Sequence, residues 1–188
     1  MKTTLLFLSV FLSASLFGQN VNIPDANFKA CLIGNSLLNT NGDSEIQLSE
    51  ASAFTGVIYC IYQSISDLTG IEALTALTYL DLQGNNLTSL DVSSNTALTY
   101  LSCVENQLTS LDVSGATALT GLTCNINQLT SLDVSQNTVL EQLKCGENQL
   151  TSLDVSNNTA LTYLTCGFNL LTSLDVSSNT ALTLLGCW

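Results

Sequence analysis

A repeat of 21 residues runs through most of the chain and limits the folds that it can adopt. From residue 77 onward, cysteine, asparagine and aspartate each recur with this spacing, the cysteines at Cys103, Cys124, Cys145, Cys166 and Cys187. A fixed period of this length is typical of a solenoid, in which each repeat forms one coil stacked on its neighbours. Such a molecule has long flat faces in place of a central pocket, and such faces usually bind macromolecules.

Each repeat contains two short segments in which every second residue is apolar, the period of a strand with one buried face. In the repeat from Leu98 to Ala118, the first segment is Leu-x-Cys and the second is Leu-x-Val. Turns rich in Asn, Ser and Gly follow both segments and leave no room for a long helix. We therefore predict a mainly β solenoid with short parallel strands on two faces of each coil, around a narrow leucine core.

Asparagine forms two columns along the repeats, represented by Asn106 and Asn137. A coil that turns inward buries backbone amides and carbonyls, and these groups need partners. Because an asparagine amide both donates and accepts hydrogen bonds, we interpret both columns as structural.

The motif L-x-x-L-x-[LC]-x-x-N-x-L, found from Leu98 to Leu108, resembles the leucine-rich-repeat signature. The second half of each repeat, L-x-x-L-D-V, is similar to the 21-residue IRREKO class of bacterial leucine-rich repeats. The segment VNIPDANFKACLIGN resembles the N-terminal region of secreted leucine-rich-repeat proteins from Gram-negative bacteria. The resemblance implies a leucine-rich-repeat solenoid, secreted or on the bacterial cell surface, that binds other macromolecules.

Three segments are expected along the chain. Residues 1–19 read as a signal peptide, with Lys2 followed by an apolar stretch that is too short to span a membrane. Residues 20–56 lack the period and are predicted to form a small helical N-terminal cap, with Asp25 capping a helix. Residues 57–188 form the solenoid, and because they stop at Trp188 inside a strand segment, we expect the native protein to continue.

The cysteines of the repeats occupy a position that also accepts leucine at Leu82, which indicates a buried apolar site. We interpret these cysteines, with Cys60 at the equivalent position of an earlier coil, as free thiols that fill the core. Cys31 lies outside the pattern, and a disulfide from Cys31 to Cys60 is the alternative.

The charge of the chain is −12, from 15 acidic residues against three lysines, with no arginine and no histidine. Such a chain should be repelled by nucleic acid and by anionic lipid, and no segment is expected to insert into a membrane. With no histidine, and no nucleophile beside a base, the sequence does not indicate an enzyme. We expect no cofactor, calcium excepted.

The outward positions of the first strand segment differ from coil to coil, whereas LTSLDVS recurs unchanged five times on the other side. A face that varies can recognise an irregular partner, and exposed aromatic residues suit a protein interface. Neutral drift after duplication would leave the same pattern. The predicted partner-binding residues are Tyr79, Tyr100, Ser102, Glu105, Thr123, Ile126, Gln142, Lys144, Glu147, Tyr163, Thr165 and Phe168.

The unchanged face carries a column of aspartates, of which Asp112 and Asp133 are neighbours. Parallel strands would place these carboxylates about 4.8 Å apart. We expect the repulsion between like charges to raise their pKa in the folded state.

The segment NTNGDSEIQLSE resembles the calcium-binding loop of an EF-hand, which carries oxygen ligands at positions 1, 3, 5, 7, 9 and 12. It departs from that pattern where asparagine replaces the first aspartate and Ser44 replaces the glycine of the sharp turn. A loop of turn-forming residues between two helices is the alternative. The candidate calcium ligands are Asn39, Asn41, Asp43, Glu45 (through its carbonyl), Gln47 and Glu50.

Two functions remain for this architecture. The first is an adhesion-type interaction module that binds a protein or glycan through the variable face. The second is a rigid spacer for a domain beyond the C-terminus, stabilised by calcium if the loop binds it.

Overall fold

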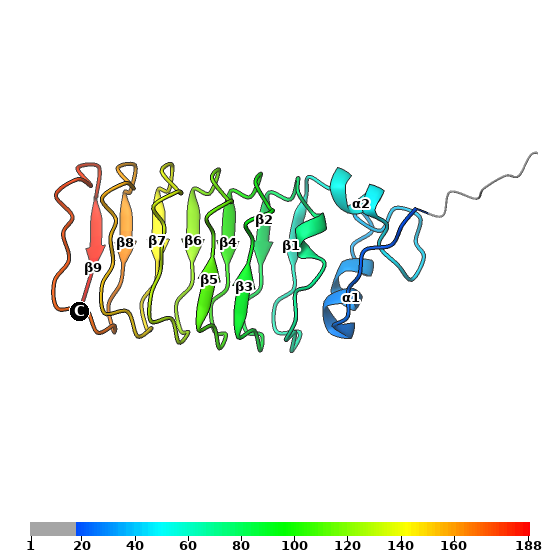
Figure 1. The fold of residues 1–188 in the computed structure, drawn as a ribbon, viewed down its shortest axis with the longest axis horizontal. Helices are drawn as coiled ribbons and strands as arrows, with labels where there is room; N and C mark the ends of the chain where they lie inside the picture. The colour runs from blue at the N-terminus through cyan, green and yellow to red at the C-terminus, as the bar shows by residue number, and fades with distance from the viewer. Residues whose placement is uncertain (1–17) are drawn as a thin grey trace, which may run out of the picture.

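The computed structural model describes residues 18–188 and shows a single row of stacked coils with two short helices at one end (Figure 1). The predicted signal peptide, residues 1–19, lies almost wholly outside the described residues. No helix in the described part of the chain is long and apolar enough to cross a membrane.

Seven parallel strands form one continuous sheet along the molecule, in the order β1-β2-β4-β6-β7-β8-β9. Each strand is three residues long, and in every strand of this sheet except β9 the central residue is buried in the core. The strands are β1 (Val57–Tyr59), β2 (Tyr79–Asp81), β4 (Tyr100–Ser102), β6 (Gly121–Thr123), β7 (Gln142–Lys144), β8 (Tyr163–Thr165) and β9 (Leu184–Gly186). This arrangement confirms the predicted solenoid.

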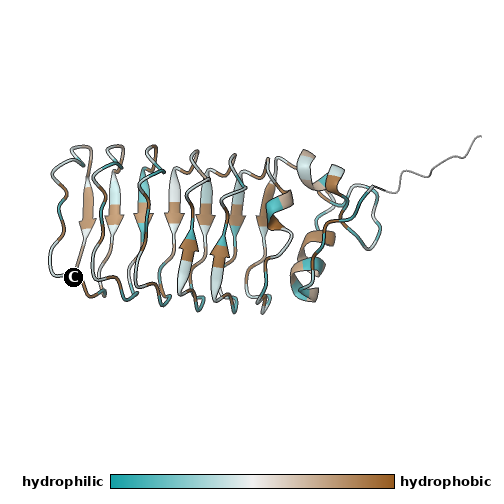
Figure 2. Ribbon diagram, viewed as in Figure 1, coloured by the Kyte–Doolittle hydropathy of each residue, from teal (hydrophilic) through white to brown (hydrophobic). Residues whose placement is uncertain are grey.

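The opposite side of the coils carries a second sheet, which contains only β3 (Ser89–Asp91) and β5 (Ser110–Asp112). Hydropathy alternates along the strands, most of which have an apolar central residue (Figure 2). The space between the two sides is filled by leucines and valines with almost no exposed surface, such as Leu101, Leu122 and Val134. Parallel strands buried on one face gain most of their stability from this packing.

Asparagine side chains join each coil to the one before it. Asn127 donates from Nδ2 to the carbonyls of Cys124 in its own coil and Cys103 in the preceding coil. Its Oδ1 accepts the amide proton of Leu108, again in the preceding coil. The same bonds recur at Asn106, Asn148 and Asn169. The structural interpretation of this column is therefore confirmed.

The second asparagine column donates in a similar way but is interrupted at Ala116. Asn137 bonds the carbonyls of Val113 and Ala116 in the coil before it, and Asn158 and Asn179 repeat this contact. Where Ala116 replaces asparagine, Gly115 packs so closely that an added Cβ would lie 1.8 Å from the Ser93 carbonyl oxygen. The two coils in contact at Gly115 are also the two whose strands on the second side, β3 and β5, pair with each other. We infer that the asparagine side chains hold the other coils apart on this side.

The cap contains helix α1 (Ala26–Ile33) and helix α2 (Leu48–Ala53), and a short 3-10 turn, η1 (Ile71–Ala73), follows in the first irregular coil. Asp25 caps α1 as predicted, accepting the amides of Asn27 and Phe28. Its second oxygen accepts the amides of Ser66 and Asp67, which fixes the helix to the solenoid.

The cysteines follow the predicted pattern with two corrections. The first is Cys187, a free thiol that is exposed at the last described coil and does not fill the core. Cys103, Cys124, Cys145 and Cys166 are free and buried, and burial raises the pKa of Cys103 to about 12. The second correction is Cys60, which is not a free core thiol, because it forms a disulfide with Cys31 across 29 residues. The α1 helix brings Cys31 beside the first coil, with 5.9 Å between the two Cα atoms, a normal separation for a disulfide.

The close approach at Gly115 yields a stability prediction. Gly115→Ala should lower the free energy of unfolding by about 1–3 kcal/mol, because the new methyl group cannot fit against the Ser93 carbonyl without moving a coil. Urea unfolding followed by circular dichroism measures the change. Ser94→Ala, the equivalent exposed position one coil earlier, is the control and should change stability by less than about 0.5 kcal/mol. Equal effects of the two substitutions would contradict the prediction.

Candidate interaction face

The seven-stranded sheet aligns its outward side chains in two columns. Strand register places Tyr79, Tyr100, Gly121, Gln142 and Tyr163 in one column. The second column contains Asp81, Ser102, Thr123, Lys144 and Thr165. The structure thus brings eight of the predicted partner-binding residues onto one face. Ser102 differs from the others because it is only 5% exposed and offers little surface to a partner.

Three tyrosines form a stack across the first coils of this sheet. The rings of Tyr79 and Tyr100 are nearly parallel, at 11°, with their centroids 4.6 Å apart. Tyr59 is tilted by 55° against Tyr79 at a centroid distance of 5.4 Å and is 62% exposed. Because each ring is held by its neighbour, the stack presents an ordered aromatic surface.

Two glycines make room for tyrosine rings from the preceding coil. A Cβ at Gly121 would lie 2.7 Å from the Tyr100 ring, and one at Gly84 would lie 2.1 Å from the Tyr62 ring. The Tyr100 hydroxyl then reaches Thr123 Oγ1 at 3.4 Å. At these two places, residues at variable positions of adjacent coils therefore fit one another.

Tyr62 leads into a polar cluster at the edge of the face. Its hydroxyl donates to Glu105 Oε2 at 2.5 Å and accepts a bond from Gln83 Nε2 at 3.1 Å. The bond from Tyr62 lowers the pKa of Glu105, and the same bond raises the pKa of the Tyr62 hydroxyl. Glu105 is therefore a carboxylate at neutral pH.

A third column lies at the turn after each strand, where the backbone is left-handed. Values of φ between 54° and 56° occur at Glu105, Ile126, Glu147 and Phe168, and also at Tyr62 in the first coil. Non-glycine residues seldom adopt this conformation, and for a β-branched residue such as Ile126 it is strained. The side chains of these left-handed residues are all exposed beside the sheet. Of the four repeat residues in this column, the three other than Ile126 carry a charge or an aromatic ring at the surface.

Towards the C-terminal coils, the face becomes mixed in charge. The ammonium of Lys144 lies 5.2 Å from the centroid of the Tyr163 ring, a cation–π distance. A shallow pocket of about 300 Å³ lies beside this pair and is also lined by Glu147, Phe168 and Trp188. Phe168 is 74% exposed, so this part of the face is apolar and accessible.

Sequence reasoning missed Tyr59 and Tyr62 as members of the face. The pairing of Val57 with Tyr79 spans 22 residues, so the first coil does not follow the 21-residue period. Cys60 lies five residues before Ile65, as Cys103 lies five residues before Leu108, and this shared spacing could have aligned the first coil with the others.

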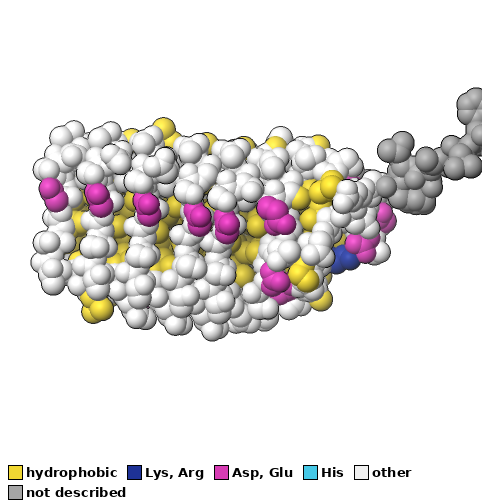
Figure 3. Space-filling view, viewed as in Figure 1, with side chains coloured by type: hydrophobic (Ala, Val, Ile, Leu, Met, Phe, Trp, Pro, Cys, Tyr) yellow, Lys and Arg dark blue, Asp and Glu magenta, His cyan; other side chains and the backbone are white. Residues whose placement is uncertain are grey.

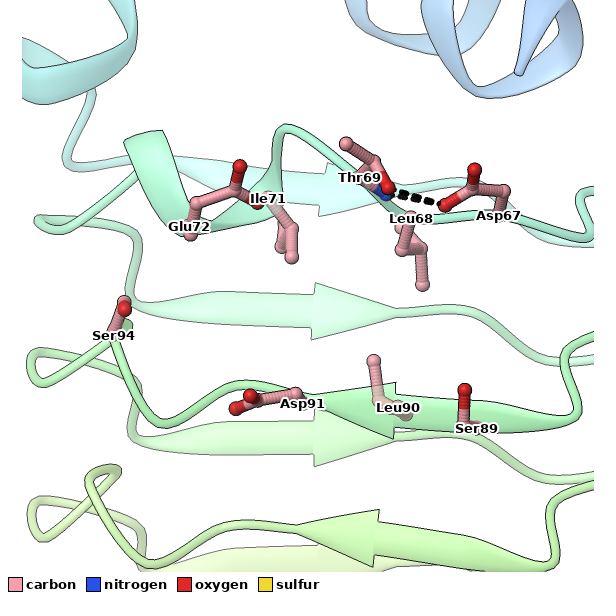
Figure 4. Close-up of a pocket in the computed structure, with 9 residues that line it drawn as sticks. All are labelled: Asp67, Leu68, Thr69, Ile71, Glu72, Ser89, Leu90, Asp91 and Ser94. Carbon is pink, nitrogen blue, oxygen red and sulfur yellow. Dashed lines mark hydrogen bonds between the residues drawn. The ribbon is translucent and has the colours of Figure 1, made fainter. Parts of the chain in front are cut away.

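The unchanged side of the coils carries the aspartate column, which appears as a row of acidic side chains in Figure 3. Shallow grooves run between adjacent coils here, and one groove is drawn in Figure 4. Its lining includes Asp67, Glu72 and Asp91, with Ser89 and Ser94. In the same view Thr69 donates to Asp67, so this carboxylate is already engaged within its own turn.

The prediction that repulsion between neighbouring aspartates raises their pKa in the folded state was wrong. The pKa values of Asp112, Asp133, Asp154 and Asp175 are lowered, because each carboxylate accepts the backbone amide of the serine two residues later. For Asp133 and Ser135 this bond is 2.9 Å long. The charge of the next aspartate acts in the opposite direction but more weakly, since these exposed groups are screened by water.

The lowered pKa values predict how stability depends on pH. Because the folded state binds these protons less readily than the unfolded state, the aspartates stabilise the fold above their unfolded pKa of about 3.9. This contribution should disappear as the pH falls through the folded pKa, so the melting temperature should drop below about pH 4. Asp133→Asn with Asp154→Asn keeps an acceptor for each serine amide and should flatten the drop. A melting temperature that rises on acidification would contradict this.

The candidate calcium loop is folded around its own side chains. The Asp43 carboxylate accepts from the amides of Asn41 and Gln47, at 2.9 and 3.0 Å, so these three side chains converge. Glu50 Oε1 accepts the backbone amides of Thr40 and Asn41, which closes the loop onto α2.

The remaining two candidate ligands behave differently. The Glu45 side chain turns away to pair with Lys29 at 2.6 Å, which leaves only its carbonyl for the loop. Asn39 Nδ2 donates to the carbonyls of Ile33 and Asp43, while its buried Oδ1 has no partner. Among the described residues, no three acidic or cysteine side chains gather closely enough to hold a metal ion. A calcium ion here would therefore be held by no more than two carboxylates, those of Asp43 and Glu50, together with amide and carbonyl oxygens.

Comparison with known proteins agrees with this architecture. The Leucine Rich Repeat family matches residues 76–96. The functional domain of InlJ from Listeria monocytogenes, which includes a cysteine ladder, is 41% identical with a TM-score of 0.68, over 90% of this chain and 42% of that one. The Leptospira interrogans protein LIC12759 is 26% identical with a TM-score of 0.61, over 65% of this chain and 34% of that one. No curated protein of related sequence was found.

The chain is therefore a leucine-rich-repeat protein with 21-residue repeats, similar to leucine-rich-repeat proteins of bacteria. It spans less than half the length of the two solved structures that it resembles. Its fold is one that generally serves as a protein-interaction scaffold.

Proposed function

We propose that the protein is a secreted or cell-surface adhesion module that binds a macromolecular partner through the seven-stranded sheet face. The observation that carries the proposal is the fit between side chains of successive coils, in which Tyr100 lies over Gly121 and Tyr62 lies over Gly84. An ordered aromatic surface loses little side-chain freedom on binding, which favours affinity. The signal peptide predicted at residues 1–19 supports a role outside the cell or at its surface.

The face offers no arrangement for chemistry. In its strongest polar cluster the Tyr62 hydroxyl donates to Glu105, and this bond raises the pKa of the hydroxyl, so Tyr62 is a poorer nucleophile than a free tyrosine. We propose a binding role and no catalytic one.

The test compares two sets of substitutions on opposite sides of the coils. The first set replaces Tyr100, Lys144, Tyr163 and Phe168 with alanine. The control set replaces three exposed residues of the unchanged side with alanine: Thr109, Ser131 and Thr151. Both proteins are applied, with the parent, to arrays of purified extracellular proteins and of glycans. We expect the first set to weaken binding at least tenfold, as for interface hot spots, and the control to have no effect.

Equal binding by all three proteins would favour the alternative, a rigid spacer, because a spacer makes no use of its variable face. Melting temperatures of the three proteins establish that any loss of binding does not come from unfolding.

The loop from Asn39 to Glu50 supports a second, smaller proposal, that calcium stabilises the cap. Three convergent side chains and the unpartnered Oδ1 of Asn39 provide oxygen atoms close together. Hydrogen bonds already satisfy Asp43 and Glu50, so calcium would have to displace them, and weak binding is expected.

Calcium at several millimolar should therefore raise the melting temperature, because a ligand that binds only the folded state stabilises it. Asp43→Ala with Glu50→Ala should remove this gain. Magnesium, which tolerates irregular oxygen sites poorly, is the matched control ion. An unchanged melting temperature in calcium would rule out the site.

A further inference from the structure

The charges of the described chain are distributed unequally. All of its acidic residues lie within residues 18–188, together with two lysines, Lys29 and Lys144. Lys29 is paired with Glu45 in the cap, and Lys144 lies over Tyr163 on β7 and β8. The sheet face formed by β1, β2, β4 and β6 therefore has no cationic side chain.

This same part of the face carries the tyrosine stack of Tyr59, Tyr79 and Tyr100, here called the tyrosine platform. Asp81 lies beside this stack, and a second carboxylate, Glu105, lies farther along the face, in the turn after β4 where it bonds Tyr62. Asp81 is the register partner of Tyr59 on the neighbouring strand. The face of an aromatic ring attracts cations, and an adjacent carboxylate adds to the attraction.

Both carboxylates keep an oxygen available to a partner. Asp81 accepts one bond, from the Gln83 amide to Oδ1 at 3.1 Å, and its Oδ2 has no donor within the described chain. Glu105 accepts the Tyr62 and Gln83 side chains at Oε2, while its Oε1 has no donor among the same residues. The charge of Asp81 also contributes to the raised pKa of Tyr79, after burial and the neighbouring Tyr100, which agrees with its closeness to the stack.

We propose that the tyrosine platform binds an arginine-bearing polypeptide segment, with guanidinium groups on the tyrosine rings and their charge neutralised by Asp81 and Glu105. Arginine suits this site better than lysine because its planar group stacks on an aromatic ring and can bond a carboxylate through two N–H groups. The inference rests on the proposed function, since it names the partner chemistry of the same face. The net charge of −12 adds a long-range attraction for a basic partner.

The test measures binding of a labelled 12-residue peptide of alternating arginine and serine by fluorescence anisotropy, at two salt concentrations. Analogues with lysine or glutamate in place of arginine test the cation, and neutral hexasaccharides of glucose and N-acetylglucosamine test a glycan. We expect arginine to bind tighter than lysine by several-fold, glutamate and the saccharides not to bind, and salt to weaken binding.

Three variants test whether the peptide binds at the tyrosine platform. Asp81→Asn with Glu105→Gln should weaken binding about tenfold, as should Tyr79→Leu with Tyr100→Leu, which keeps apolar contact but removes the rings. Gly121→Ala should also weaken binding, because it displaces the Tyr100 ring without changing any charge or aromatic residue. Circular dichroism melting identifies any variant that fails to fold. The peptide affinities of the remaining variants then decide whether the platform is the binding site.

The matched control is Asp133→Asn with Asp154→Asn, which changes the net charge equally but on the opposite side of the coils. It should leave the peptide affinity within about twofold. If it weakens binding as much as Asp81→Asn with Glu105→Gln, the peptide is attracted only by net charge and the proposal is overturned. Binding of a saccharide and not the peptide would overturn it too.

The result separates this inference from the proposed function. If the peptide does not bind, but a protein found on the array is lost when Tyr163 and Phe168 are changed, the face binds a partner of different chemistry. The proposed function then stands without the arginine-bearing segment.

Discussion

The bonds of one asparagine per coil determine how the rest of the molecule is arranged. Each amide, such as that of Asn127, satisfies carbonyls of two coils and an amide of the preceding coil, so a buried turn loses no backbone partner. A buried carbonyl or amide without a partner costs about 1–3 kcal/mol, and every coil would otherwise leave several. The bonds also hold successive coils in register, and that register aligns the outward columns of the sheet. The interaction face therefore depends on a polar bond in the interior.

The interior is uniform, whereas the surface is not, and the two differ for a physical reason. Leucine positions such as Leu122 and Leu143 are fully buried, so only side chains of similar volume fit them. Outward positions meet water and accept many side chains, provided that the neighbouring coil leaves space. Gly121 meets this condition for Tyr100, because the absence of a side chain on the adjacent strand leaves space for the tyrosine ring. The shape of this face thus depends on pairs of residues in adjacent coils as well as on single positions.

The sequence predicted features that depend on period, and it failed where a contact depends on three-dimensional detail. Leucine and asparagine spacing predicted the coils and their bonds, because both follow from local repetition. The Cys31–Cys60 disulfide depends on where helix α1 lies, and no periodic signal contains that information. The first coil pairs at 22 residues, so Tyr59 and Tyr62 were not recognised as part of the face. The aspartate pKa values were misjudged because a turn within each coil, through residues such as Ser135, outweighs repulsion between coils.

The overlap of Tyr62 with Gly84 and of Tyr100 with Gly121 has a consequence for how the array can change during evolution. Whole coils of a solenoid can be duplicated or lost by recombination, but a cut between two overlapping coils would leave a tyrosine ring facing a side chain that it cannot cover. The junction between Gly121 and Gln142 contains no tyrosine at the paired position, so coils can be exchanged there without disturbing the rings. The tyrosine overlaps therefore lie within the four coils of β1, β2, β4 and β6, and an exchange of coils after β6 would leave them intact.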